Sequence, residues 1–207
     1  VTEIASRALT IAIAQLNPTV GDIDGNTERV RRAVASAPTC DLVVCTELVL
    51  LGYPPEDLVL RPAVIDATRR AIEVLAAETA GGPAVLVTAP WRDEGRVYNA
   101  AVLLDGGGIA SIRYKHQLPN YGVFDEKRVF AAGPLPEPIT FRGVRLGVMI
   151  CQDMWGSDVA RHLASRGAEL LLVPNGSPFE RSKLTRRIDL TADRVRETDL
   201  PLVSVNQ

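Results

Sequence analysis

The chain has 207 residues, of which 46% are hydrophobic and 23% charged, and its net charge of −2 comes from 23 basic and 25 acidic residues. This length suits one α/β core, and the absence of long runs of one charge sign argues against binding to nucleic acid or to an anionic membrane. No apolar stretch reaches the ~18 residues that span a bilayer, and the N-terminus lacks a signal-peptide pattern.

Apolar runs and helical patterns alternate along most of the sequence. The predicted strands cover residues 9–16, 42–45, 84–89, 97–104, 109–114, 144–150, 170–174 and 202–205. The predicted helices cover residues 27–36, 62–79, 157–166 and 184–198. Asn26 is the expected N-cap of the first helix, and Pro62 suits the first position of the second. The last helix places Ile188, Ala192 and Val195 on one face.

The middle of the chain departs from a simple β-α-β repeat. Asp105 and three glycines at 106–108 join two predicted strands. Glycines can also cradle a phosphate, but no helix follows these, so the pattern favours a hairpin turn. The residue patterns therefore predict a mixed sheet with helices on one side, followed by a loop-rich region at 117–138.

Cysteine and histidine usage limits the possible chemistry. Three cysteines, Cys40, Cys45 and Cys151, form an odd number without disulfide-like spacing, which favours a reducing cytoplasm. The histidines His116 and His162 stand alone, so the sequence predicts no metal site.

Cys151 ends an apolar strand pattern and precedes a short polar segment that leads to a helix. A cysteine at such a strand end is exposed at the sheet edge beside free backbone N–H groups, which suits a nucleophile with an oxyanion hole. Taken alone, Cys151 is more typical of a small buried hydrophobe, as most free cysteines are.

Two further charged residues follow predicted strands. Glu47 comes after the strand at 42–45, and Lys115 comes after the strand at 109–114. Since active sites of α/β proteins gather where strands end, these residues and Cys151 can converge on one cleft. Glu47 would take the thiol proton and Lys115 would stabilise the thiolate and an oxyanion. Each residue alone is more typical of a solvated surface, but the three together indicate an enzyme.

Glu47, Lys115 and Cys151, in this order, resemble the Glu–Lys–Cys triad of the nitrilase (carbon–nitrogen hydrolase) superfamily. The segments 11–22, 52–58, 118–126 and 175–179 resemble one branch, the glutaminase domains of glutamine-dependent NAD synthetases. The resemblance implies an α/β fold of the nitrilase type, a four-layer αββα sandwich. It also implies hydrolysis of L-glutamine to glutamate and ammonia through a glutamyl thioester.

The resemblance extends to the organisation of the protein. It implies that residues 1–207 form a C-terminally incomplete glutaminase domain that lacks its last strands. An ATP-dependent synthetase domain is then expected beyond residue 207, where ATP, Mg and deamido-NAD bind and ammonia converts deamido-NAD to NAD. The glutaminase domain itself is expected to need no cofactor, and the protein to form a homo-oligomer.

Further site residues are implied by the same resemblance. Glu126 matches a second glutamate that positions Lys115 or the hydrolytic water. Tyr121 and Ser177 match residues that hold glutamine, and Lys183 matches a basic residue near the substrate's α-carboxylate.

One position departs from the family. Gln152 stands where the family usually has an acidic residue, although its backbone N–H would still serve as the oxyanion donor. This leaves open what its side chain does in substrate contact.

Two alternatives stay open. One is a stand-alone amidase of the same superfamily that acts on another small amide. The other is a non-catalytic member whose scaffold serves assembly, which the intact Glu47, Lys115 and Cys151 disfavour.

Overall fold

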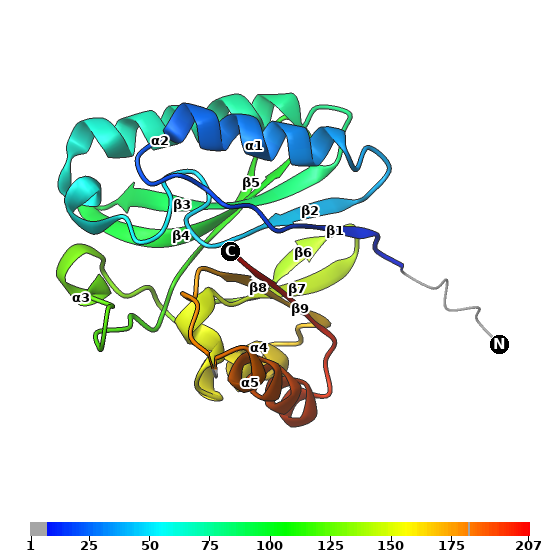
Figure 1. Cartoon of the computed structure of the whole chain (residues 1–207). Coiled ribbons are helices and arrows are strands. Elements are labelled where there is room, and N and C mark those ends of the chain that lie inside the picture. The colour runs from blue at the N-terminus through cyan, green and yellow to red at the C-terminus, as the bar shows by residue number, and fades with distance from the viewer. Residues whose placement is uncertain (1–7, 182) are drawn as a thin grey trace.

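The computed structural model describes residues 8–181 and 183–207, which form two β-sheets packed face to face with helices on both outer surfaces (Figure 1). The first sheet contains β1 (Ile11–Ala14), β2 (Leu42–Cys45), β3 (Ala84–Asp93), β4 (Arg96–Asp105) and β5 (Gly108–Tyr114). The second contains β6 (Ile139–Phe141), β7 (Val144–Val148), β8 (Leu170–Asn175) and β9 (Leu202–Asn206). Helices α1 (Ile23–Ala35) and α2 (Pro62–Glu78) cover the first sheet, and α4 (Asp158–Ser165) and α5 (Lys183–Thr198) cover the second. The expected four-layer αββα sandwich is confirmed.

Both sheets are mixed, and in each sheet strands that are consecutive in sequence lie next to each other. In the first sheet β1, β2 and β3 run parallel, and β4 is antiparallel to both of its neighbours. In the second sheet β6 is antiparallel to β7, and β7, β8 and β9 run parallel. The mixed sheet with helices on one side that the residue patterns predicted is confirmed in the first sheet, and the strands after residue 138 form a second mixed sheet.

The alternation of side chains along β2 explains this division. Val43 and Cys45 belong to the core between the first sheet and its helices. Leu42 and Val44 point to the opposite face and pack with residues of the second sheet. Successive side chains of a strand face opposite ways, so a strand that is apolar throughout is buried on both sides.

Two helix starts contrast with each other. α2 begins at Pro62 as predicted. α1 begins at Ile23, and its N-cap is Asp22, whose side chain accepts a hydrogen bond from the N–H of Gly25. The N-cap predicted at Asn26 was wrong because Asn26 is buried inside the helix, where its amide bonds the loop at Thr19 and the carbonyl of Leu50.

The predicted hairpin between β4 and β5 is confirmed, and Gly106 and Gly107 both have positive φ angles, 59° and 87°. Such angles at both central residues are typical of the tight type I′ turn. The region 117–138 is loop-rich as predicted, with the short helix α3 (Glu126–Val129) inside it. Two short 3₁₀ helices, η1 (Glu56–Leu60) and η2 (Cys151–Met154), were not foreseen.

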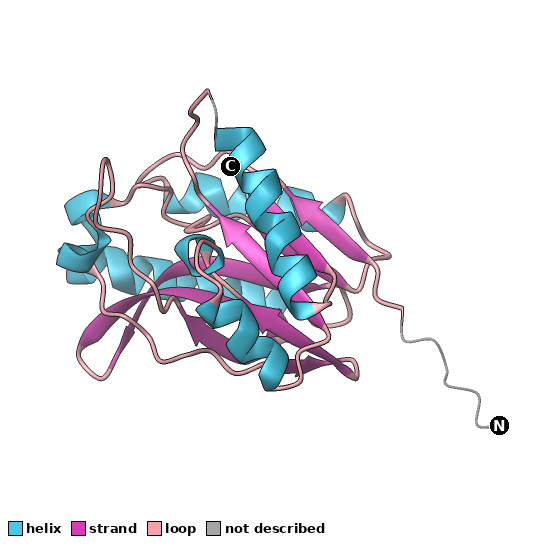
Figure 2. Cartoon of the chain, turned by 90° about the horizontal axis from the view of Figure 1, so that it is seen from below, coloured by secondary structure: helices cyan, strands magenta, loops and turns pink. Residues whose placement is uncertain are grey.

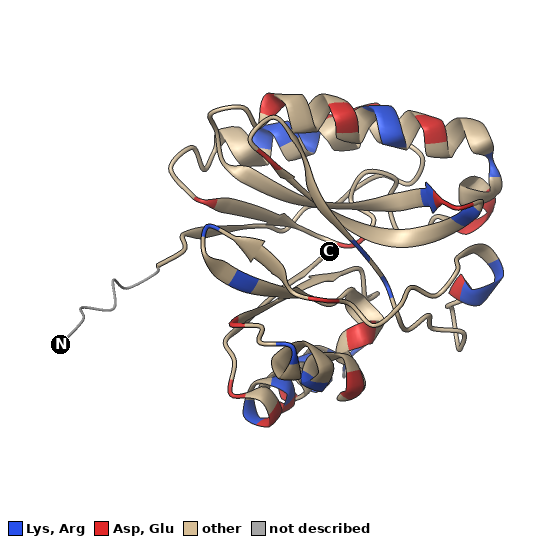
Figure 3. Cartoon of the chain, turned by 180° about the vertical axis from the view of Figure 1, so that it is seen from behind, with Lys and Arg blue, Asp and Glu red and all other residues tan. Residues whose placement is uncertain are grey.

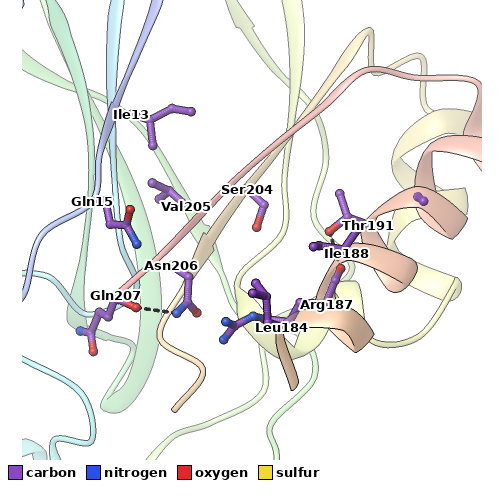
Figure 4. A pocket seen from close by; sticks show the side chains of 11 residues that line it. Ile13, Gln15, Leu184, Arg187, Ile188, Thr191, Ser204, Val205, Asn206 and Gln207 are labelled. Carbon is purple, nitrogen blue, oxygen red and sulfur yellow. Dashed lines mark hydrogen bonds between the residues drawn. The ribbon is translucent and has the colours of Figure 1, made fainter. Parts of the chain in front are cut away.

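The apolar face predicted for α5 exists but is exposed. Ile188 is 60% exposed, and α5 buries Lys183 and Arg194 instead. α5 lies across the second sheet (Figure 2). Its exposed face borders a groove of about 610 Å³ with the edges of β1 and β9, where Ile13 and Gln207 also lie (Figure 4).

Charged residues of both signs are spread over the outer helices, whereas the strands between them carry few (Figure 3). This distribution fits the small net charge of the chain. Within the described residues, no helix is long and apolar enough to cross a membrane.

Candidate active site

The three predicted catalytic residues follow the carboxyl ends of strands from both sheets, β2 and β5 in the first and β7 in the second. Glu47 comes two residues after β2, Lys115 directly follows β5, and Cys151 opens η2 shortly after β7. Strand β7 ends at Val148, two residues before its predicted end. Glu47 and Lys115 are fully buried and Cys151 is 3% exposed. All three side chains are therefore shielded from bulk water.

Lys115 joins two carboxylates. Its Nζ donates to Oε1 of Glu47 over 2.7 Å and to Oε1 of Glu126 over 2.8 Å. Burial alone would lower the pKa of Lys115, but the charges of Glu47 and Glu126 outweigh it and raise that pKa. The ammonium therefore stays charged inside the protein.

Glu47 has two further partners that the sequence did not reveal. Asn99, in the middle of β4, donates its Nδ2 to Oε1 of Glu47 over 2.8 Å. The backbone N–H of Gly176, which follows β8, donates to Oε2 over 3.0 Å. A Cβ atom at position 176 would lie 3.0 Å from that same oxygen, so a larger residue there would require the Glu47 side chain to shift.

Cys151 lies in the electrostatic field of this cluster. Burial and the negative charge of Glu47 raise the pKa of the thiol well above its ordinary value, while Lys115 and the N–H of Gly176 act in the opposite direction. Its φ angle of 45° is a left-handed conformation that L residues rarely adopt. The raised pKa keeps Cys151 a neutral thiol in the resting protein.

Glu126 receives a second hydrogen bond from the hydroxyl of Tyr53, whose oxygen lies 2.9 Å from Oε1. Burial raises the pKa of Glu126 to about 7, and the charge of Lys115 limits this rise. Glu126, which only the resemblance indicated, thus accepts hydrogen bonds from both Tyr53 and Lys115.

The four other predicted residues lie near this cluster without joining it. Tyr121 is half exposed, and its hydroxyl donates to the side-chain oxygen of Gln152 over 2.8 Å. Ser177 is buried, and its Oγ has no hydrogen-bond partner among the described residues. Lys183 is also buried, 3.7 Å from a carboxylate oxygen of Glu180.

A pocket of about 330 Å³ brings some of these residues together. It is lined by Tyr121, Gly122, Val123, Phe124, Trp155, Glu180, Lys183 and Arg186. The ammonium of Lys183 lies 5.3 Å from the centre of the Phe124 ring, and the guanidinium of Arg186 lies 4.8 Å from that of Trp155. Two cations and one carboxylate thus line an aromatic-walled pocket, which suits a small polar molecule with a carboxylate.

The other cysteines have a different environment. Cys40 and Cys45 are buried, and burial alone raises the pKa of Cys45 to about 12. Within residues 8–181 and 183–207, no three His, Cys, Asp or Glu side chains are arranged to hold a metal ion.

Comparison with known proteins identifies the class. Residues 10–207 match the carbon–nitrogen hydrolase family, and the chain belongs to this family. It is 45% identical over 198 residues to a glutamine-dependent NAD(+) synthetase of Rhodobacter capsulatus, covering 95% of this chain and 36% of that protein. The chain thus spans little more than a third of that relative.

Solved structures share the fold. A glutamine-dependent NAD+ synthetase from Acinetobacter baumannii superposes with a TM-score of 0.91 at 34% identity, over 96% of this chain and 38% of the other. An amidase from Nesterenkonia sp. AN1 superposes with a TM-score of 0.83 at 25% identity, over 96% of this chain and 78% of the other. That amidase carries acrylamide added at its active-site cysteine. The chain has the nitrilase fold.

Proposed function

We propose that this chain hydrolyses the side-chain amide of L-glutamine to glutamate and ammonia. The observation that carries the proposal is the buried Lys115 ammonium between Glu47 and Glu126, beside the Cys151 thiol. A base, a cation and a sulfur nucleophile are the groups that amide hydrolysis through a thioester requires. The names of the curated relatives support glutamine as the amide.

In the first half of the reaction Glu47 takes the thiol proton as the Cys151 sulfur attacks the amide carbon. Lys115 and the backbone N–H of Gln152 stabilise the oxyanion of the tetrahedral intermediate. The C–N bond then breaks, Glu47 returns the proton to the leaving nitrogen, and ammonia departs. A glutamyl thioester on Cys151 remains.

In the second half water attacks the thioester carbon while Glu47 accepts one of its protons. The C–S bond breaks, glutamate leaves and the proton returns to the sulfur. The raised pKa of Cys151 fits this sequence, because the thiol then ionises only as it attacks. Glu126 keeps the ammonium of Lys115 in place through both steps.

The pocket beside Gln152 offers a place for the amino acid end of glutamine. Lys183 would attract the α-carboxylate, and Tyr121 and the hydroxyl of Ser177, which has no partner in the described part of the chain, would hold the rest of the substrate. The side chain of Gln152, held by Tyr121, would line the path between this pocket and Cys151.

At the level of the whole protein, we propose that the ammonia serves an ATP-dependent synthetase domain. That domain would bind ATP, Mg and deamido-NAD and form NAD, in a homo-oligomer located in the cytoplasm. Support comes from the names of the relatives and from their length, of which this chain spans 36% and 38% in two of them.

A stand-alone amidase is the second candidate. The Nesterenkonia amidase favours it, because this chain superposes on 78% of that protein. Steady-state rates with L-glutamine and with simple aliphatic amides separate the two candidates. A preference for aliphatic amides would replace glutamine as the proposed substrate.

The nucleophile is tested by glutamate release from L-glutamine with the wild type and with Cys151→Ala. We expect loss of hydrolysis in this variant, whereas Cys40→Ala, which removes a buried cysteine elsewhere in the core, stays active. In a protein that contains the synthetase domain, Cys151→Ala should still form NAD from free ammonia. Glutamine hydrolysis by Cys151→Ala would refute the proposed mechanism.

A further inference from the structure

Asp153 is a buried carboxylate that the proposed reaction does not use. It lies two residues after Cys151, within η2, and is 1% exposed. Burial raises its pKa to about 6, although hydrogen bonds from backbone N–H groups oppose this rise. Because burying a carboxylate costs free energy, Asp153 must have hydrogen-bond donors that compensate for the loss of water.

Both oxygens of Asp153 accept hydrogen bonds from the backbone. Oδ1 accepts from the N–H groups of His116, over 3.1 Å, and Gln117, over 2.7 Å. Oδ2 accepts from the N–H of Ile150 over 3.0 Å. One rigid, short side chain therefore connects two backbone segments that are more than 30 residues apart in sequence.

These three N–H groups flank the residues of the reaction. His116 and Gln117 directly follow Lys115, and Ile150 directly precedes Cys151. The left-handed backbone of Cys151 is strained and persists only where its surroundings fix it. The bond to Ile150 fixes the chain at this point, and the same carboxylate fixes the chain that carries Lys115.

We propose that Asp153 is a positioning residue, which sets the position of the Lys115 ammonium relative to the Cys151 sulfur by holding both backbone segments on one carboxylate. Asp153 itself contacts no reacting atom. The inference rests on the proposed function, because it concerns the geometry of the same nucleophile and cation. It predicts that catalysis depends on Asp153 more than folding does.

Asp153→Asn tests this directly, since it keeps the shape of the side chain but turns one acceptor into a donor. One of the two backbone segments then loses its bond. We expect kcat to fall about 10- to 100-fold, while KM changes by no more than about twofold. A purely structural residue would lower the amount of folded enzyme without changing kcat per folded molecule.

A second readout does not need glutamine. Addition of acrylamide to Cys151, followed by intact mass, measures how readily the thiol reacts in its folded surroundings. We expect Asp153→Asn to slow this addition about tenfold. Asp41→Asn is the matched control, because Asp41 also accepts a backbone N–H, that of Thr10, but precedes β2 at the end opposite Glu47.

The outcomes separate clearly. A wild-type kcat and a wild-type rate of acrylamide addition in folded Asp153→Asn would overturn the inference. If Asp153→Asn does not fold, the same two measurements are made on Asp153→Ser, which keeps a single short acceptor. If neither variant folds, Asp153 serves the fold as a whole and the inference fails. A wild type that labels at Cys151 but leaves glutamine intact would refute the proposed function, while the labelling rates would still test Asp153.

Discussion

Asn99 contacts Glu47 through its side chain, with Nδ2 only 2.8 Å from Oε1, and accepts the backbone N–H of Lys115 through its carbonyl at the same distance. Asn99 thereby holds the proposed base and the backbone of the proposed cation at once. It is fully buried in β4, where a polar side chain is costly unless it has such a partner.

Asn99→Ala should therefore reduce glutamine hydrolysis. A hydrogen bond to a charged group contributes about 1.5–3 kcal/mol, which corresponds to a loss of about 10- to 100-fold in kcat/KM. Steady-state kinetics measure it. The control is Thr68→Ala, which removes a buried hydroxyl that donates to the carbonyl of Val64 within α2. Equal losses in both variants would show that burial, not contact with Glu47, is responsible.

The pH dependence of Cys151 alkylation follows from its raised pKa. Burial and Glu47 keep the thiol protonated, so the rate constant for iodoacetamide should still rise with pH through about pH 9, above the ordinary thiol pKa of about 8.5. Labelling followed by peptide mass spectrometry measures it, with Cys151→Ala as the blank. A plateau that begins below about pH 7 would contradict this prediction, because it indicates a preformed thiolate.

Gly176→Ala should disturb both activity and stability. Its new Cβ would lie 3.0 Å from Oε2 of Glu47 and 3.2 Å from Cγ of Tyr53, so these side chains must shift. Overpacking of this kind costs about 1–3 kcal/mol of unfolding free energy. Urea unfolding measures the cost. Gly82→Ala is the control, because its Cβ meets open space, and an equal cost in both variants would contradict the prediction.

Stability should fall as pH rises because of Glu126. Its pKa is about 7 in the folded protein, against about 4.3 for an ordinary glutamate, so between these values the folded state binds more protons than the unfolded state. The contribution of Glu126 is fully present below about pH 4.3 and is lost as pH rises through about 7. The free energy of unfolding, measured by urea at several pH values, should decline less steeply in Glu126→Gln. The same decline of unfolding free energy with pH in the wild type and in Glu126→Gln would contradict the raised pKa of Glu126.

Some of the site was predictable because strand ends are visible in the sequence. Glu47, Lys115 and Cys151 each follow an apolar run, and parallel strands bring their carboxyl ends to one edge. Glu126 lies in a loop and a single helical turn, where no periodicity marks it, so only the resemblance to a family indicated it.

The supporting contacts had no local signal. Asn99 lies 52 residues from Glu47, and Gly176 lies 129 residues from it, so only the packing of the two sheets creates these hydrogen bonds. The error at Asn26 has the same origin: its amide bonds a distant carbonyl at Leu50 in preference to the N-terminus of its own helix. The exposed face of α5 shows conversely that an amphipathic pattern does not say which surface will cover it.

The position of Lys115 between Glu47 and Glu126 decides which inactive variant suits a structure with intact substrate bound. Replacing Lys115 would leave two buried carboxylates facing each other without a counter-ion, and the pair would rearrange or take up a proton. Replacing Cys151 with alanine removes one sulfur atom and leaves every charge where it is. Crystals for soaking with intact amide should therefore be grown from the alanine variant at 151.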